Sequence, residues 1–262
     1  MTVLQVLALI GAGVVAGVFS TVVGLASVVS YPALLAIGLP PLSANMTNTV
    51  ALLFTGVGAA AGSRPELTGQ GARVRRLAAI AAVGGAAGAA LLLITPSQTF
   101  VRVAPVLIGL ASLALLLAPR PGPEYRGGAL ASGGPGGRPR DRERSGWLLA
   151  GVFGVAVYVG YFGAAAGIVM LALLTAMLAE PLARTNAVKN ILGGVTNAIA
   201  AVAFAVFGHV DWAAVVPLAA GFLAGGWIGP ALVRRLPGQV LRIAIGAGGV
   251  ILAVRLAIAA YR

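Results

Sequence analysis

Long apolar stretches of similar length follow one another along the chain. A helix crosses a hydrocarbon core about 30 Å thick with roughly 20 residues, at about 1.5 Å per residue. The pattern predicts membrane-spanning helices over 3–22, 43–62, 76–95, 99–118, 147–163, 186–207, 212–233 and 239–260. Two shorter pieces, 26–38 and 166–179, each follow a glycine turn. We expect each of them to be a tilted short helix or a re-entrant half-helix.

Two polar segments within these apolar surroundings resemble each other. TNTVALLF begins at Thr47 and TNAVKNIL begins at Thr185. Aligned with an offset of 138 residue numbers, they also pair Asn48 with Asn186. An internal repeat in a hydrophobic chain is typical of secondary transporters, whose binding site lies between two related halves.

The stretch between the halves differs in composition. Residues 119–146, PRPGPEYRGGALASGGPGGRPRDRERSG, are rich in Pro, Gly and alternating charges and cannot form a hydrophobic core. We therefore predict an N-terminal membrane repeat over 1–118, a flexible cytoplasmic linker over 119–146 and a C-terminal membrane repeat over 147–262. The predicted fold is an all-α polytopic membrane protein with two inverted repeats, each of about four transmembrane helices plus a short or re-entrant helix.

Composition and charge agree with residence in a bilayer. Hydrophobic residues make up 59% of the chain and charged residues 9%, with a mean hydropathy of +0.99, which excludes an ordinary soluble domain. The net charge is +12, but the arginines gather in connections between apolar stretches. This distribution favours orientation by the positive-inside rule over nucleic-acid binding. The connections at 63–76 and 234–235 are then cytoplasmic, like the linker, and both termini lie outside.

The residues needed for enzymatic chemistry are scarce. The chain has no cysteine, one histidine and six carboxylates, none of them within a long apolar stretch. Acid–base and metal chemistry need such groups in clusters. We therefore expect no enzymatic activity, no cofactor and no metal site.

Polar side chains beside the interrupted helices are the candidate binding residues. A helix that begins in mid-membrane presents its positive dipole end to an anion. The candidates are Ser27, Ser30, Asn45, Thr47 and Asn48 in the first half, and Thr185, Asn186, Lys189 and Asn190 in the second. Lys189 is the only lysine, and an ionisable residue in a transmembrane helix indicates function. If the halves pack antiparallel, we expect Asn48 and Asn186 to come together near the middle of the molecule.

A structural interpretation of the same residues remains open. Ser, Thr and Asn side chains between membrane helices often only bond to a neighbouring helix, and this interpretation has at least equal weight for Ser27 and Ser30. Lys189 is close enough to the expected cytoplasmic border to extend its ammonium to the lipid headgroups. A non-transporting membrane scaffold would show the same packing of small residues.

Taken together, these features resemble the sulfite exporter TauE/SafE family, also called the 4-toluene sulfonate uptake permease family. The resemblance rests on PALLAIGLP from Pro32, the Thr-Asn segment after it, ARTNAVKN from Ala183 and GHVDW from Gly208. It implies a transporter in the bacterial cytoplasmic membrane that moves sulfite, a sulfonate, sulfoacetate or thiosulfate. The lack of an intramembrane proton relay favours an exporter or uniporter. The expected partners are the lipid bilayer and a small anion, homo-oligomerisation is left open, and the alternatives are a different small solute or a scaffold.

Overall fold

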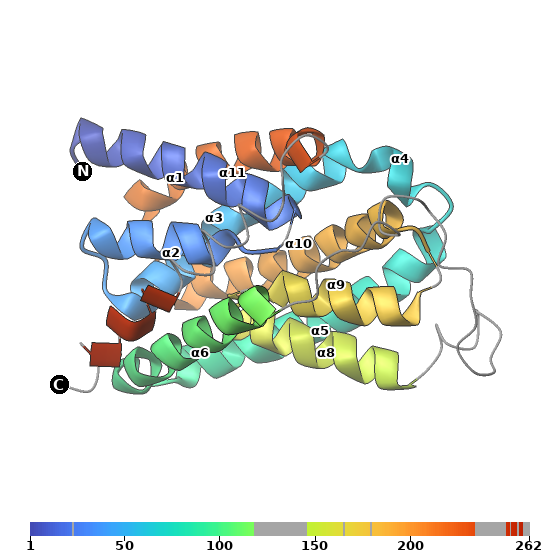
Figure 1. Ribbon diagram of the computed structural model, residues 1–262. Helices are drawn as coiled ribbons and strands as arrows, with labels where there is room; N and C mark the ends of the chain where they lie inside the picture. Colours follow the sequence, from blue (N-terminus) through green and yellow to red (C-terminus); the bar gives the residue numbers. More distant parts are fainter. Residues whose placement is uncertain are drawn as a thin grey trace.

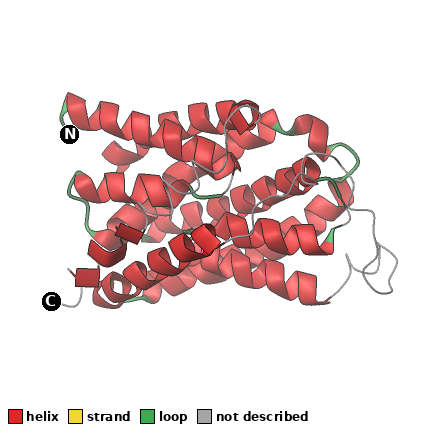
Figure 2. Ribbon diagram, viewed as in Figure 1, coloured by secondary structure: helices red, strands yellow, loops and turns green. Residues whose placement is uncertain are grey.

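The protein is helical throughout its described part. The computed structural model describes residues 1–22, 24–117, 146–164, 166–178, 180–233 and 250–258 except 252 and 256. The helices are α1 (Val3–Val22), α2 (Ala26–Ala36), α3 (Pro41–Gly62), α4 (Arg64–Leu67), α5 (Gly71–Ile94), α6 (Ser97–Leu117), α8 (Gly146–Tyr161), α9 (Ala166–Met177), α10 (Leu182–Phe207) and α11 (Trp212–Val233) (Figure 1). These residues contain no strand, which confirms the all-α prediction (Figure 2). Nearly all of the predicted linker, the 234–235 connection and most of the predicted 239–260 helix lie outside the described residues.

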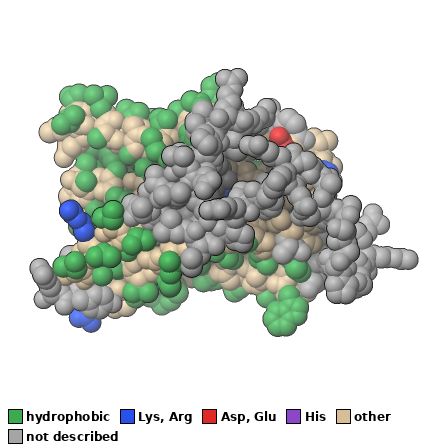
Figure 3. All heavy atoms as spheres, in the orientation of Figure 1, with side chains coloured by type: hydrophobic (Ala, Val, Ile, Leu, Met, Phe, Trp, Pro, Cys, Tyr) green, Lys and Arg blue, Asp and Glu red, His purple; other side chains and the backbone are tan. Residues whose placement is uncertain are grey.

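The outer surface of the helices suits a lipid environment. Four segments are long and apolar enough to cross a membrane, namely Val3–Thr21, Gly71–Ile94, Arg184–Phe207 and Trp212–Gly229. Large apolar side chains such as Leu4, Ile94, Phe207 and Trp227 are each more than two-thirds exposed. Apolar side chains are spread over the face seen in Figure 3, with few charges among the described atoms. The structure therefore agrees with a multi-pass membrane protein.

Glycine faces allow two helix pairs to pack closely. α1 lies along α11, where Gly17 contacts Gly225, and α5 lies along α8, where Gly88 contacts the backbone at Val157. A Cβ at Gly17 or Gly88 would collide with the facing backbone. Small residues at these positions allow membrane helices to approach closely. In both pairs a helix from one half packs against a helix from the other.

The long helices α3 and α10, which carry the Thr-Asn pairs, run antiparallel. Ser43, near the start of α3, donates to the carbonyl of His209 at 2.8 Å, just after the end of α10. Arg184, near the start of α10, donates to the carbonyl of Thr68 at 2.9 Å, after the end of α3. Both pairs of equivalent residues, Ser43 with Arg184 and Thr68 with His209, differ by 141 residue numbers. This reciprocal arrangement is compatible with two inverted repeats.

The short helices and the basic connection complete the comparison with the predicted elements. α2 has 11 residues and α9 has 12, so each is about 17–18 Å long and spans little more than half of the core. The connection predicted over 63–76 is shorter than expected, because α4 lies within it and α5 begins at Gly71. Arginine has a high helix propensity, so the helix extends through Arg73, Arg75 and Arg76 beyond the apolar stretch.

Candidate functional site

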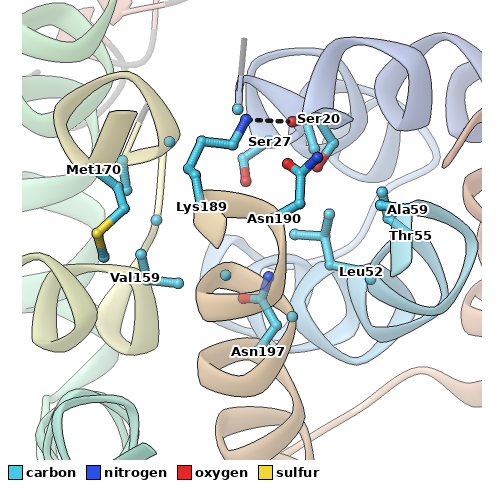
Figure 4. A pocket seen from close by; sticks show the side chains of 18 of the residues that line it. Ser20, Ser27, Leu52, Thr55, Ala59, Val159, Met170, Lys189, Asn190 and Asn197 are labelled. Atoms are coloured by element: carbon cyan, nitrogen blue, oxygen red, sulfur yellow. Dashed lines mark hydrogen bonds between the residues drawn. The ribbon is translucent and has the colours of Figure 1, made fainter. Parts of the chain in front are cut away.

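A small cavity lies between the two halves (Figure 4). Its walls are the end of α1, the start of α2 and the middle of α3 from the first half, with the end of α8, the start of α9 and the middle of α10 from the second. Its volume is about 80 Å³. A single water needs at least about 10–15 Å³, whereas a site for a drug-sized ligand measures about 300–1,000 Å³. The cavity therefore has room for a small ion and a few waters.

Two glycine turns bring the short helices to this cavity. Gly24 follows α1 with a φ of 77°, and Gly163 follows α8 with a φ of 73°. Glycine adopts this left-handed conformation without the steric cost that a Cβ imposes. Ala26 and Ala166 then begin α2 and α9, and all four residues line the cavity. The positive ends of both short helices therefore lie at the cavity wall, as the interrupted apolar pattern suggested.

Lys189 is the only charged side chain among the described residues that line the cavity. The residue is 4% exposed, and its Nζ lies 3.5 Å from the carbonyl oxygen of Ser20 (Figure 4). No carboxylate in the described part of the chain forms an ion pair with it. A buried charge without a counter-ion is strongly unfavourable. An anion in the cavity would therefore be stabilised by this ammonium.

Several other polar groups of the cavity have unused hydrogen-bonding capacity. Asn190 and Asn197 lie on the same face of α10 as Lys189, and neither side chain forms a hydrogen bond with another described residue. On α3, the hydroxyl of Thr55 is buried and has no hydrogen-bond partner among the described residues. Because buried polar groups are normally paired, such groups at one cavity are suited to a polar ligand or water.

Three other predicted asparagines hold the walls of the cavity in place. The Asn45 amide on α3 donates to the carbonyl of Tyr161, at the end of α8, at 3.0 Å. The Asn186 amide on α10 donates to the carbonyl of Thr21, near the end of α1, at 3.1 Å. Each bond connects a long helix of one half, α3 or α10, to the segment beside the glycine turn of the other half. Asn48 donates to Ser27 at 3.2 Å, and Ser27 itself lines the cavity.

The remaining predicted residues bond elsewhere. Thr47 accepts a bond from the backbone N–H of Asp211 at 3.0 Å. Thr185 donates to the carbonyl of Pro181 and Ser30 to that of Ala26, both within their own segments. Of the nine predicted residues, Ser27, Lys189 and Asn190 line the cavity, while Ser30, Asn45, Thr47, Asn48, Thr185 and Asn186 do not.

The expected meeting of Asn48 and Asn186 is not observed. α3 crosses α10 where Gly56 contacts Gly194. Each asparagine lies eight residues before this crossing, which corresponds to about 12 Å along its helix. Because the helices are antiparallel, the two side chains lie on opposite sides of the crossing. Asn45 makes the contact in the first half that Asn186 makes in the second, so these two residues are structurally equivalent. The alignment by sequence identity, which pairs Asn48 with Asn186, is therefore shifted by about one helical turn from the structural one.

Sequence reasoning missed polar residues on two helices. Ser20 and Thr21 line the cavity at the end of α1, and Thr49 and Thr55 line it on α3. The α3 residues share a face with Leu52, Gly56 and Ala59, at helical spacings of three and four, and this periodicity was available as a signal. No such periodicity marked Ser20 and Thr21 on α1. A hydroxyl at a helix end commonly bonds to the backbone of its own helix, so its presence there does not indicate a cavity.

The helical fold with its apolar spans and the cavity between its halves indicate a multi-pass membrane protein. The family model of the sulfite exporter TauE/SafE matches residues 9–256, so the chain belongs to this family of membrane transporters. Searches of curated proteins and of solved structures gave no match.

Proposed function

We propose that the protein moves a small sulfur oxyanion, such as sulfite or thiosulfate, across the bacterial cytoplasmic membrane through this cavity. The observation that carries the proposal is the buried ammonium of Lys189, which faces the cavity without a carboxylate partner among the described residues. A cationic solute would be repelled by this charge, and a neutral solute would gain less from it than an anion does. The family membership supports the same class of substrate.

The side chains around Lys189 have distinct tasks in this proposal. Lys189 supplies the charge, while the amides of Asn190 and Asn197 and the hydroxyl of Thr55 donate hydrogen bonds to the anion's oxygens. The starts of α2 and α9 add their positive dipole ends. A volume of about 80 Å³ favours sulfite and thiosulfate over an aromatic sulfonate.

The proposed direction is outward, by export or uniport. A membrane potential of about 100 mV, negative inside, drives each anionic charge outward with about 2.3 kcal/mol. Import of the same anion would need coupling to another ion. No Asp, Glu or His lines the described cavity, so a proton relay through a carboxylate or an imidazole has no side chain there. Efflux from proteoliposomes under an imposed potassium diffusion potential tests the direction.

Calorimetric titration of the purified protein tests the site. Sulfite, thiosulfate, sulfoacetate, taurine, sulfate and chloride are compared on the wild type, Lys189→Gln and Lys189→Arg. Loss of a charged hydrogen bond worth about 1.5–3 kcal/mol weakens sulfite binding by Lys189→Gln about 10- to 150-fold. Lys189→Arg retains the charge, so its loss is smaller.

The matched control is Arg75→Gln, which removes one positive charge from an exposed position on α5. It should bind sulfite as the wild type does. Equal sulfite affinity of the wild type and Lys189→Gln would rule out Lys189 as the anion site. It would favour a scaffold or the transport of another solute.

A further inference from the structure

A charged cluster joins the two halves at one end of the molecule. Glu180, between α9 and α10, bridges two arginines from different halves. Its Oε1 lies 3.0 Å from Nη1 of Arg73 on α5, and its Oε2 lies 3.0 Å from Nη1 of Arg184 on α10. Arg73 also donates to Gln70 at 2.7 Å, and Arg184 donates to the carbonyl of Thr68 at 2.9 Å. These bonds therefore connect α5 and the segment before it to Glu180 and the start of α10.

These ion pairs are partly withdrawn from solvent. The side chains of Arg73 and Glu180 are 18% and 17% exposed, and that of Arg184 is 36% exposed. Removing one partner from a partly buried pair leaves an uncompensated charge, which is more costly than breaking an exposed pair. Separation of the two segments is therefore unfavourable unless another anion takes the place of the Glu180 carboxylate.

At the opposite end of the molecule, the residues equivalent to this charged cluster are neutral. Residues equivalent under the offset of 141 are Arg184 and Ser43, Arg73 and Ala214, and Glu180 and Leu39. Ser43 makes the same bond to a carbonyl of the other half that Arg184 makes, with a neutral hydroxyl. A neutral hydroxyl therefore makes this contact at one end, where a guanidinium makes it at the other. The contact itself does not require charge, so the charges at the Glu180 end are available for a further task.

The positive charges continue from this cluster toward the cavity. Arg184 precedes Lys189 by five residues of α10, or about 7.5 Å along the helix axis. The equivalent of Lys189 under the same offset is the neutral Asn48. Cationic side chains therefore lie between the cavity and one end of the molecule, and the equivalent side chains toward the other end are neutral.

We propose that Arg73 and Arg184 form a second anion subsite, which the carboxylate of Glu180 occupies until a small sulfur oxyanion displaces it. The inference rests on the proposed function. Sulfite presents several oxygens on one central atom, as a carboxylate does, so it can bridge the same two guanidinium groups. The exchange keeps both arginines paired while it frees the α9–α10 segment from α5. This end of the molecule then opens when an anion is present and stays closed otherwise.

Sulfite titration of variants in lipid nanodiscs tests the subsite. Lys189→Gln serves as the background, because it removes the cation of the cavity. Adding Glu180→Gln removes the carboxylate that pairs with Arg73 and Arg184. We expect sulfite to bind about tenfold more tightly to this double variant than to the background variant. Adding Arg73→Gln as a third change abolishes the gain.

Asp211→Asn in the same Lys189→Gln background is the matched control. It removes one carboxylate from the opposite end and keeps an acceptor for the Ala214 N–H, which Asp211 binds at 3.0 Å. No gain in sulfite affinity is expected. The subsite is refuted if Glu180→Gln adds no sulfite binding while the variant melts like its background, or if Asp211→Asn gives the same gain.

A second measurement applies if Glu180→Gln does not fold. Arg184→Gln alone should lower sulfite efflux from proteoliposomes about tenfold, while sulfite affinity at the cavity stays within about twofold of the wild type. Arg184→Lys should restore part of the rate. Unchanged efflux by Arg184→Gln overturns the subsite. Failure of the proposed function would appear separately, as equal sulfite affinity of the wild type and Lys189→Gln.

Discussion

Asparagine side chains have two different positions in this protein. The side-chain amides of Asn45 and Asn186 donate hydrogen bonds to backbone carbonyls of the opposite half. The side chains of Asn190 and Asn197 face the cavity and form no hydrogen bond with another described residue. Sequence alone marks all of them as polar residues in apolar helices. It does not tell them apart, because the direction of each amide depends on which helix packs opposite.

Alanine substitutions separate these two positions. Asn186→Ala leaves the Thr21 carbonyl without its amide partner, so the free energy of unfolding falls by about 1–3 kcal/mol. Asn197→Ala removes no bond within the described protein, so stability changes little and sulfite binding weakens several-fold. Denaturant unfolding in mixed micelles and calorimetry on the same samples measure both quantities. The reverse pattern would show that Asn186 binds substrate and that Asn197 supports the fold.

At the scale of the helices, apolar length predicted most boundaries. α1 ends and α11 begins and ends where the hydrophobic pattern placed them, because lipid contact selects an uninterrupted apolar stretch. α3 and α10 begin earlier than predicted, because each starts directly after a proline at its N-cap position, Pro40 or Pro181, ahead of the apolar residues. α4 was not predicted, because its four residues have no apolar periodicity.

The relation between the two halves was predicted less well. The alignment by sequence identity pairs the two Thr-Asn segments. The contacts in the structure instead match Ser43, Asn45 and Thr55 with Arg184, Asn186 and Thr196, which is an offset of 141. Thr55 lies against Gly226 and Thr196 against Gly85, again with the offset of 141. A shift of about one turn leaves a helix with nearly the same buried face, so the sequence pattern cannot exclude it. The cavity was therefore expected between the halves, but only part of its lining was identified.

The turn at Gly24 gives a prediction for these elements. Gly24→Ala introduces a Cβ at positive φ, which costs about 1–2 kcal/mol, and places it against the backbone of Gly167 on α9. Gly38→Ala has the same backbone cost, because its φ is 97°, but its Cβ meets nothing within 4 Å. We expect Gly24→Ala to lower both stability and sulfite affinity, and Gly38→Ala to lower stability alone. Equal losses in the two variants would show that the contact between the halves has no importance for the cavity.

Over the whole molecule, charge is distributed unevenly between the two ends. Glu66, Arg73, Glu180 and Arg184 lie at the end where α4 is seen in Figure 1, and the α1 start lies at the other end. The positive-inside rule places the arginine-rich end in the cytoplasm. An anion leaving the cell would then meet the arginine pair first and Lys189 next. Orientation and the proposed direction of transport are therefore linked and can be tested together.

Cysteine labelling of α5 tests this orientation. The chain has no cysteine, so a single introduced thiol is the only one present. Ala72 and Ser97 are exposed, the first in the initial turn of α5 and the second just after its end. Because α5 is long and apolar enough to cross a membrane, we expect the two positions to lie on opposite sides.

With the arginine-rich end inside, an impermeant maleimide applied to intact cells modifies Ser97→Cys and leaves Ala72→Cys unmodified. Ala72→Cys reacts in inverted vesicles, and full reaction of both variants in detergent controls for reactivity. Labelling of Ala72→Cys from outside would place the arginine pair on the outer face. A positive entrance on that side would attract anions from the medium, and the proposal of export would then give way to import coupled to another ion.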